Sequence, residues 1–321
     1  MIIDTEKLFS GDRRTLAKAI TLIESQKHSD RQLSQTLLGE ISPQTGNSIR
    51  IAISGIPGVG KSTFIESFGQ FLIKNNHKVA VLAIDPSSPL HGGSILGDKT
   101  RMEKLGQEKN AYIRPTPTSG ALGGVASHTR ETILLCEAAG FDIILLETVG
   151  VGQSEFSAAA MVDFFMVLMV PNAGDELQGI KKGILELAAA IIVNKADGNN
   201  IAQAQAAAQE YQNAIHLKPS NDNTWNPQVV TCSSLENKNI DKIWNIITEY
   251  INWSKKHHYF SAKRKEQNQD WFKKLVYDMI EYKLNHDQQI TKLWKQLNNE
   301  IAAEKTSPHC AATKLLNHLL P

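Results

Sequence analysis

The sequence has few cysteines, almost no net charge and no long apolar run. Its three cysteines, Cys136, Cys232 and Cys310, lie far apart and form no CxxC pair, so we expect neither a disulfide framework nor a structural zinc site. The 34 Lys and Arg residues are balanced by 33 Asp and Glu residues, which argues against a general nucleic-acid binder. No apolar stretch approaches the roughly 18 residues of a bilayer-crossing helix, so the sequence predicts no membrane-spanning helix.

The composition is that of an ordinary globular protein. Of the 321 residues, 41% are hydrophobic and 21% are charged, whereas a disordered chain combines low hydrophobicity with high net charge. At about 150 residues per domain, this length suggests roughly two domains. The amino-terminal sequence MIIDTEKLFSGDRR lacks the basic-then-apolar order of a secretory signal, so we expect a cytoplasmic protein.

Short apolar runs in the middle of the chain alternate with helical stretches. Continuous apolar runs are typical of strands that are buried on both faces of a sheet, and intervening helices are typical of parallel connections. The sequence therefore predicts an α/β fold with a mainly parallel sheet and helices on both of its faces. The expected strands are Ile49–Ser54, Lys78–Ile84, Phe141–Glu147, Phe164–Val170, Ala189–Asn194 and Pro227–Ser233.

Helical periodicity flanks the sheet region, residues 48–253, on both sides. Apolar residues at helical spacing in Thr15–Leu38 predict two amphipathic helices in an amino-terminal extension, residues 1–47. Residues 254–321 are polar and helical again. Their apolar faces have no strands to cover, so these helices pack on the main domain, on each other or on another chain. The expected helices there are Ala262–His286, a segment around Ile290–Leu297, and His309–Leu320.

A glycine-rich motif follows the first expected strand and opens a helix. Its pattern is GxxxxGK[ST], in the strand–loop–helix setting of a phosphate-binding P-loop. Glycines let successive backbone N–H groups point at phosphate oxygens, and the helix amino terminus adds a partial positive charge. Lys61 can reach the β- and γ-phosphates of a nucleotide, and the Ser62 hydroxyl can bind Mg²⁺. The nucleotide-binding residues of this motif are Gly55, Ile56, Pro57, Gly58, Val59, Gly60, Lys61, Ser62 and Thr63.

A second motif selects the base. Asn194, Lys195 and Asp197 match the NKxD signature of GTPases at the end of an expected strand. The Asp197 carboxylate can accept hydrogen bonds from both N1–H and the 2-amino group of guanine, a donor pair that adenine lacks. The last expected strand leads into a loop that resembles the base-supporting loop of such proteins, with residues Cys232, Ser233 and Ser234. Together the two motifs predict an enzyme that hydrolyses GTP to GDP and phosphate.

Three carboxylates are candidates for the magnesium and hydrolytic site. Asp85 and Glu147 end expected strands, and ligands bind at that edge of an open parallel sheet. Asp98 lies in a glycine-rich loop, where a solvated loop carboxylate is the alternative interpretation. Gly150 closes the sequence ETVG, which resembles the DxxG of GTPases, and can give its N–H to the γ-phosphate. Val151 stands where Ras-like proteins have a water-positioning Gln, so we expect slow intrinsic hydrolysis.

The combination of GIPGVGKST, IDPSSP, GDKTRM, ETVGVGQSE, GDELQGIKKGI and NKAD resembles the MeaB/ArgK family of methylmalonyl-CoA mutase-associated GTPases. The similarity covers nearly the whole chain. It implies a P-loop GTPase core of the SIMIBI class, an α-helical amino-terminal extension and a carboxy-terminal helical arm that forms a homodimer. It also implies a G-protein chaperone of adenosylcobalamin-dependent methylmalonyl-CoA mutase, which gates cofactor loading and protects or reactivates the mutase.

The resemblance also implies roles for individual residues. Asp85, Asp98 and Glu147 belong by this resemblance to the Mg²⁺ and switch network. The segment GDELQGIKKG is the family's third switch, which couples the nucleotide state to the mutase; on composition alone an ordinary polar loop is the alternative. The expected catalytic residues are Lys61, Asp98, Glu147, Gly150, Gln178 and Lys181, and the expected magnesium ligands are Ser62, Asp85, Asp98 and Glu147.

Two other functions compete with this interpretation. A metallocentre-assembly GTPase of the urease or hydrogenase type requires clustered Cys and His ligands, and His91, His128, His257 and His258 do not form a convincing cluster. A regulatory module with a purely structural nucleotide would lack the candidate Mg²⁺ carboxylates. The sequence does not distinguish methylmalonyl-CoA mutase from a related partner such as isobutyryl-CoA mutase. It predicts no nucleic-acid or membrane partner.

Overall fold

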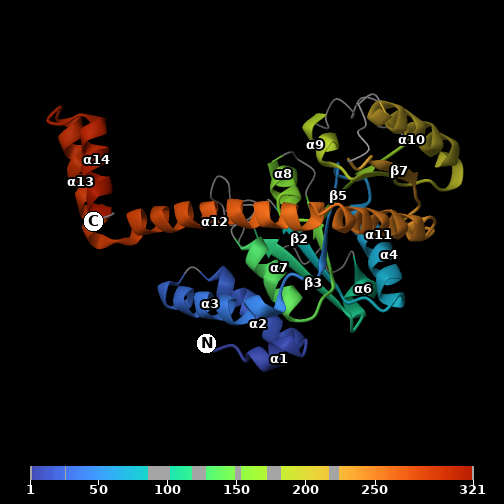
Figure 1. Ribbon diagram of the computed structural model, residues 1–321, viewed down its shortest axis with the longest axis horizontal. Coiled ribbons are helices and arrows are strands. Elements are labelled where there is room, and N and C mark those ends of the chain that lie inside the picture. The colour runs from blue at the N-terminus through green and yellow to red at the C-terminus, as the bar shows by residue number, and fades with distance from the viewer. Residues whose placement is uncertain are drawn as a thin grey trace. The chain divides into compact units, whose positions relative to one another are not determined.

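The computed structural model describes residues 2–25, 27–85, 102–117, 128–148, 153–171, 182–216 and 224–319 (Figure 1). The chain forms two compact units, Met1–Phe260 and Ser261–Pro321. The first unit contains the sheet and every described residue of the two nucleotide motifs. Among the residues that the structure describes, no helix combines the length and apolar character that crossing a bilayer requires.

The first unit is built around a parallel sheet of seven described strands, in the order β3-β2-β4-β1-β5-β6-β7. Each neighbouring pair is parallel, which confirms the predicted α/β class. The central strand β1 aligns Ile53 with Glu147 of β4 and with Met166 of β5. The strands are β1 (Ile49–Gly55), β2 (Val79–Asp85), β3 (Ala111–Pro117), β4 (Ile143–Glu147), β5 (Phe164–Met169), β6 (Ala190–Val193) and β7 (Gln228–Thr231).

Strand β3 is the one described strand that the sequence analysis did not predict. Its sequence AYIRPTP contains Pro115 and Pro117, and proline cannot donate a ladder hydrogen bond. The strand is at one end of the described order and pairs only with β2 there, a position that tolerates proline. Its two prolines and one charged residue interrupt the continuous apolar run by which the other strands are predicted.

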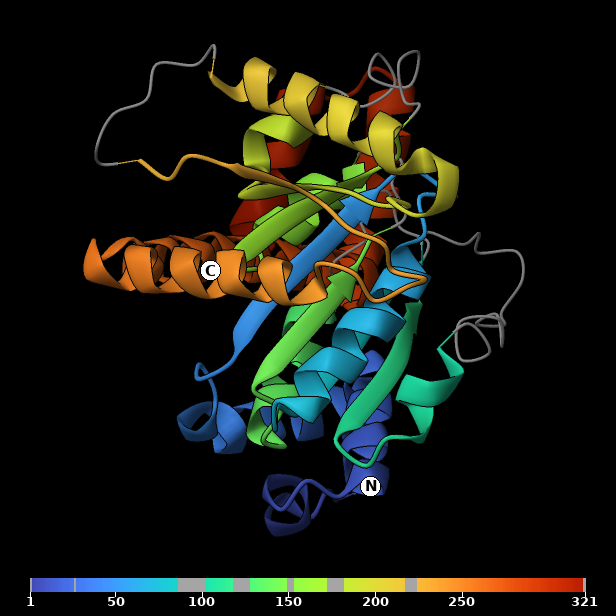
Figure 2. The same cartoon turned by 90° about the vertical axis from the view of Figure 1, so that its right-hand side faces the viewer.

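Helices cover both faces of the sheet, as predicted, because side chains alternate between the faces along each strand. In β1, Ile51 and Ile53 face one apolar layer and Ala52 faces the other. Figure 2 shows the first layer's α4 and α11 on the near side of the strands. The first layer contains α4 (Lys61–Lys74), α6 (Glu103–Gln107) and α11 (Ile240–Lys256); the second contains α7 (Thr129–Ala138), α8 (Gln153–Ala159), α9 (Lys182–Leu187) and α10 (Ile201–His216).

The amino-terminal helices pack on the second layer. Where two helices were expected, the structure has α2 (Arg13–Glu24) and α3 (His28–Ile41), preceded by a short α1 (Thr5–Phe9). Leu16 and Ile20 of α2 are fully buried in the same apolar layer as α7. The side chain of Asp12 accepts a hydrogen bond from the Thr15 backbone and caps the start of α2. This segment therefore belongs to the core of the first unit.

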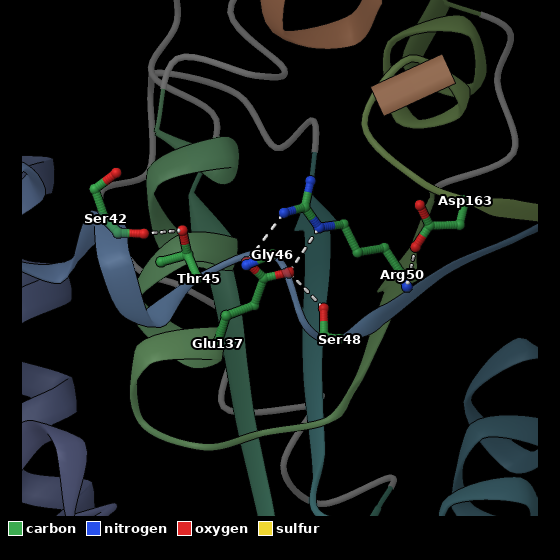
Figure 3. Close-up of polar contacts among 7 residues, drawn as sticks. All are labelled: Ser42, Thr45, Gly46, Ser48, Arg50, Glu137 and Asp163. Atoms are coloured by element: carbon green, nitrogen blue, oxygen red, sulfur yellow. Dashed lines mark hydrogen bonds and ion pairs between the residues drawn. The ribbon is translucent and has the colours of Figure 1, made fainter. Parts of the chain in front are cut away.

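A buried ion pair fixes the chain where it enters β1 (Figure 3). Glu137 of α7 accepts hydrogen bonds from the Gly46 backbone at 2.8 Å and from the Ser48 hydroxyl, and it forms an ion pair with Arg50 at 2.8 Å. The Arg50 backbone N–H in turn donates to Asp163 at 2.8 Å. Burial alone would raise the pKa of Glu137. The charge of Arg50 and the hydrogen bonds from Arg50, Ser48 and Gly46 outweigh burial and lower the pKa below its usual value. The network joins the end of the amino-terminal helices to the central strand.

The second unit is a small helical assembly. It contains most of α12 (Tyr259–His286), together with α13 (Gln288–Ala302) and α14 (Pro308–Leu319). Ile290 and Leu297 of α13 are buried against Leu315 and Leu319 of α14, with Ile280 of α12 packed on the cluster. The apolar faces of these helices therefore cover each other in part. Large apolar side chains that stay exposed on the part of α12 in this unit are Phe272, Val276, Tyr277 and Met279.

Candidate functional site

The phosphate-binding motif joins the end of β1 to the start of α4. Gly55 has a φ of +149°, and a Cβ there would lie 2.5 Å from the carbonyl oxygen of Leu168. Gly60 caps α4 in the left-handed conformation, and a Cβ there would lie 2.9 Å from the side-chain nitrogen of Asn194. Only glycine fits at these two positions. The loop is therefore shaped by close backbone approach to β5 and to the base motif.

Lys61 at the start of α4 lies over the phosphate loop. Its Nζ donates to the carbonyl oxygens of Gly55 at 2.7 Å and Ile56 at 3.2 Å. Burial lowers the pKa of Lys61, while the nearby carboxylates of Glu147 and Glu155 act to raise it. These contacts keep the ammonium group at the loop. Phosphate oxygens are stronger acceptors than carbonyl oxygens, so a nucleotide phosphate could replace these carbonyls as its partner.

A hydroxyl and a carboxylate meet beside this loop. The register of β1 and β4 aligns Ile53 with Glu147, so the carboxyl ends of the two strands lie side by side. The Ser62 hydroxyl donates to Oε1 of Glu147 at 3.1 Å. Asp85 ends β2, the neighbour of β4, so its backbone lies at the same edge of the sheet. These are oxygen ligands of the kind that Mg²⁺ prefers.

Several expected site residues fall outside the described part of the chain. Asp98, Gly150, Gln178 and Lys181 are in this group. The side chain of Asp85 is also outside it, although its backbone is described as part of β2. The described part of the expected site consists of the phosphate loop, Ser62, Glu147 and the base motif.

The base motif is bonded directly to the phosphate loop through Asn194. This buried side chain donates from Nδ2 to the carbonyl oxygen of Val59 at 3.0 Å. Its Oδ1 accepts from the backbone N–H of Ser234 at 3.1 Å and from the Ser234 hydroxyl at 2.7 Å. One side chain thus holds the phosphate loop and the loop after β7 in a fixed relation.

Lys195 and Asp197 complete the base motif. Lys195 has a φ of +60°, which is uncommon for a lysine, and its Nζ donates to the carbonyl oxygen of Gly58 at 2.7 Å. Backbone strain of this kind concentrates at functional sites. Oδ2 of Asp197 accepts a hydrogen bond of 2.5 Å from the Ser233 hydroxyl. That bond fixes the plane of the carboxylate.

Cys232 lies beneath the base motif. The side chain is fully buried, and burial raises its pKa to about 12. It is therefore a neutral thiol, and it donates to Oδ1 of Asn194 at 3.4 Å. Cys232 therefore helps to hold the Asn194 side chain in place.

A cavity of about 300 Å³ lies between the two motifs. Its walls come from the phosphate loop, from the two residues that follow β5, from Lys195 of the base motif and from Asn200. The residues that line it are Ile56, Pro57, Gly58, Val59, Val170, Pro171, Lys195 and Asn200. The two sequence motifs therefore border one common space.

Sequence reasoning missed one buried carboxylate near the phosphate loop. Glu155 of α8 is fully buried, accepts from the Thr148 hydroxyl at 3.4 Å and acts electrostatically on Lys61. In the sequence it is one acid in the first turn of a short helix, where acids are common for capping reasons. Only the fold turns it towards the phosphate site.

Comparisons with known proteins identify the family of the chain. Residues 16–289 match the family described as methylmalonyl Co-A mutase-associated GTPase MeaB. The chain is 47% identical over 280 residues to the GTPase ArgK of Escherichia coli, covering 87% of this chain and 84% of that protein. It is 42% identical over 319 residues to the mitochondrial methylmalonic aciduria type A homolog of Mus musculus, covering 96% of this chain and 77% of that protein.

A solved structure shares the fold of this chain. The crystal structure of a LAO/AO transport system kinase superposes with a TM-score of 0.74 at 36% identity, over 99% of this chain and 96% of that one. The resemblance inferred from the motifs is thereby confirmed, and so is the P-loop α/β fold. The chain belongs to the MeaB family of methylmalonyl-CoA mutase-associated GTPases.

Proposed function

We propose that this protein binds GTP and GDP with Mg²⁺ and hydrolyses GTP to GDP and phosphate. The observation that carries the proposal is the pair of hydrogen bonds made by Asn194, to Val59 and to Ser234. This side chain ties a guanine-type base motif to a phosphate loop, and residues of both motifs line one cavity. A chance occurrence of either motif would not produce that bonded arrangement.

Guanine recognition rests on Asp197. Its carboxylate would accept from N1–H and the 2-amino group of guanine, while the Ser233 hydroxyl fixes its orientation. Adenine offers no such donor pair. Lys195, held on the Gly58 carbonyl, would form a wall of the base pocket.

The phosphate chemistry rests on Lys61 and on an oxygen-rich magnesium site. Ser62 and Glu147, 3.1 Å apart, fit Mg²⁺, because both offer the oxygen ligands that this cation prefers. We assign Mg²⁺ to these two residues with Asp85 and Asp98, where it would neutralise phosphate charge. Lys61 would leave the Gly55 and Ile56 carbonyls for the β- and γ-phosphates and stabilise the charge that develops between them.

The test of this site is a binding titration. Calorimetry with GDP and with ADP, each in the presence of Mg²⁺, compares the two bases at equal phosphate content. We expect GDP to bind at least about a hundredfold more tightly, because the Asp197 hydrogen bonds are charge-assisted. Equal affinity for GDP and ADP would refute guanine selectivity.

The partner that we propose is adenosylcobalamin-dependent methylmalonyl-CoA mutase. Membership of a family described as mutase-associated supports it, as does the relative named for methylmalonic aciduria. The protein would act as a chaperone that gates cofactor loading and protects or reactivates the mutase. Residues 254–321 would form a homodimerisation arm, for which the exposed apolar side chains of α12 are available.

The segment that contains Gln178 and Lys181 would couple the nucleotide to this partner. Gln178→Ala and Lys181→Ala should weaken stimulation of GTP hydrolysis by the apo-mutase while sparing basal turnover, because in this proposal the two residues act on the nucleotide or its switches only when the bound mutase orders the segment. The measurement is steady-state hydrolysis of wild type and both variants with and without apo-mutase. Equal stimulation in all three proteins would leave the segment a surface loop without a role in coupling.

The alternative as a metallocentre-assembly GTPase is less well supported. Among the described residues, no group of three or more His, Cys, Asp or Glu side chains is arranged to hold a metal ion. A related acyl-CoA mutase is the closer competitor as partner. Binding measurements with methylmalonyl-CoA mutase and isobutyryl-CoA mutase in parallel would separate the two.

A further inference from the structure

A hydrogen bond outside both motifs connects the phosphate-binding helix to the loop that supports the base. The hydroxyl of Ser67, on α4, donates to Oδ1 of Asn237 at 2.5 Å. Ser67 is 7% exposed and lies on the same helix as Lys61 and Ser62. Asn237 lies 170 residues away in the sequence, between β7 and α11.

The loop that carries Asn237 is a small closed unit. The backbones of Ser233 and Lys238 donate to each other's carbonyl oxygens at 3.2 and 3.0 Å. Asn237 and Asn239 adopt left-handed conformations, with φ of +56° and +60°, which asparagine tolerates better than most residues. The Asn239 side chain donates to the carbonyl oxygen of Thr231 at 2.9 Å. The loop is thus fastened to β7 at one side and, through Asn237, to α4 at the other.

The same loop carries the groups that support the base motif. Ser233 donates to Asp197 and accepts from the backbone N–H of Glu236 at 3.0 Å, so its hydroxyl is oriented by the loop itself. Ser234 donates to Asn194. A shift of the loop relative to α4 would move both serines and release the Asp197 carboxylate from its fixed plane.

We propose that the Ser67–Asn237 hydrogen bond is a specificity-determining positioning contact, which holds the base-supporting loop so that Asp197 can discriminate guanine by its 2-amino group. This inference rests on the proposed GTP site. Ser67 and Asn237 do not touch the nucleotide in this scheme; they act through Ser233 on Asp197. Phosphate binding, which depends on the backbone of the phosphate loop and on Lys61, does not depend on them.

The test compares GDP with inosine diphosphate, which keeps N1–H and lacks the 2-amino group. Calorimetric titration with Mg²⁺ gives the ratio of the two dissociation constants. In wild type we expect a ratio of about ten- to a hundredfold, the range of one hydrogen bond to a charged acceptor. In Ser67→Ala and in Asn237→Gly this ratio should decrease by a factor of about three to ten. In the double variant the ratio should decrease by no more than in either single variant, because both substitutions remove the same contact.

Matched controls separate positioning from simple loss of stability. Glycine accepts the left-handed backbone at 237, so Asn237→Gly removes the contact without adding strain. Asn237→Asp keeps an acceptor oxygen for Ser67 and should retain the wild-type ratio. An unchanged ratio in both Ser67→Ala and Asn237→Gly, with only a lower melting temperature, would overturn the inference. Equal affinity of the wild-type protein for GDP and ADP would instead refute the proposed guanine site itself, and the inference with it.

Discussion

The side-chain Nδ2 of Asn194 lies 3.0 Å from the carbonyl oxygen of Val59, and this hydrogen bond joins the base motif to the phosphate loop. The same side chain accepts two hydrogen bonds from Ser234. Three segments that are distant in the sequence are therefore organised around one buried amide.

Replacing Asn194 by Ala should disturb nucleotide binding and stability together. The change leaves the Ser234 donors and the Val59 carbonyl without this partner, which costs about 1–3 kcal/mol of folding free energy. We expect GDP affinity to fall at least about tenfold. Urea unfolding and calorimetric titration measure the two effects. Asn298→Ala, on the exposed surface of α13, is the control and should change neither; wild-type GDP affinity in Asn194→Ala would contradict the bridging role.

Replacing Asp197 by Asn should switch the preferred base. The substitution exchanges one acceptor oxygen for an NH₂ donor, so guanine loses a hydrogen bond and xanthine, with its 2-oxo group, gains one. We expect the variant to prefer XTP over GTP, with a change in relative affinity of about a hundredfold or more. Competition between the two nucleotides for the purified variant measures this. A preference for GTP equal to that of wild type would show that Asp197 does not read the base.

Replacing Lys61 by Ala should stop turnover and leave the fold intact. The ammonium group stabilises charge that develops between the β- and γ-phosphates, so its loss should lower GTP hydrolysis by at least about a hundredfold. Two of its contacts are hydrogen bonds to loop carbonyls, and we expect the fold to be retained. The control is Lys74→Ala at the exposed end of the same helix. Normal turnover in Lys61→Ala would remove the phosphate loop from the mechanism.

Replacing Glu137 by Gln should destabilise the protein in a pH-dependent way. The folded protein holds the pKa of Glu137 below its usual value of 4.5, so the ionised carboxylate stabilises the fold above that pH. Its contribution is lost as the pH falls through the lowered pKa. At pH 7 we expect the variant to be about 3 kcal/mol less stable than wild type, because Arg50 loses its buried ion-pair partner.

The difference between wild type and Glu137→Gln should shrink as the pH falls below the usual value of 4.5 and through the lowered pKa of Glu137. Urea unfolding at several pH values measures it. Glu40→Gln, an exposed substitution on α3, should show no such difference at any pH. A stability difference that stays constant from pH 7 to pH 3 would mean that the charge of Glu137 does not contribute.

Local patterns were sufficient to predict the fold class and the two motifs. The phosphate loop needs glycine at fixed positions, and the apolar runs of β1, β4 and β5 are long enough to predict buried strands. The same apolar pattern does not predict β3, because Pro115 and Pro117 interrupt it. The sequence also left open what the carboxy-terminal helices cover, and the buried contacts between α13 and α14 answer part of that question.

The contacts between distant segments could not be predicted. Ser67 and Asn237 are ordinary polar residues in a helix and a turn, and nothing in either segment indicates that they meet. Glu155 was likewise indistinguishable from a helix-capping acid until the fold placed it near Lys61. Pairings of this kind depend on how strands and helices stack in three dimensions, which no local sequence window contains.

Steady-state phosphate release from GTP and from ATP by the wild-type protein, with and without apo-methylmalonyl-CoA mutase, is the sharpest test of the proposed function. We expect slow release from GTP alone, at roughly 10⁻⁴ to 10⁻² per second as for unstimulated GTPases. Release from GTP should be faster when the mutase is added, and release from ATP should stay at background in both conditions. Hydrolysis of ATP at the same rate as GTP, or GTP hydrolysis that does not respond to the mutase, would refute the proposed function.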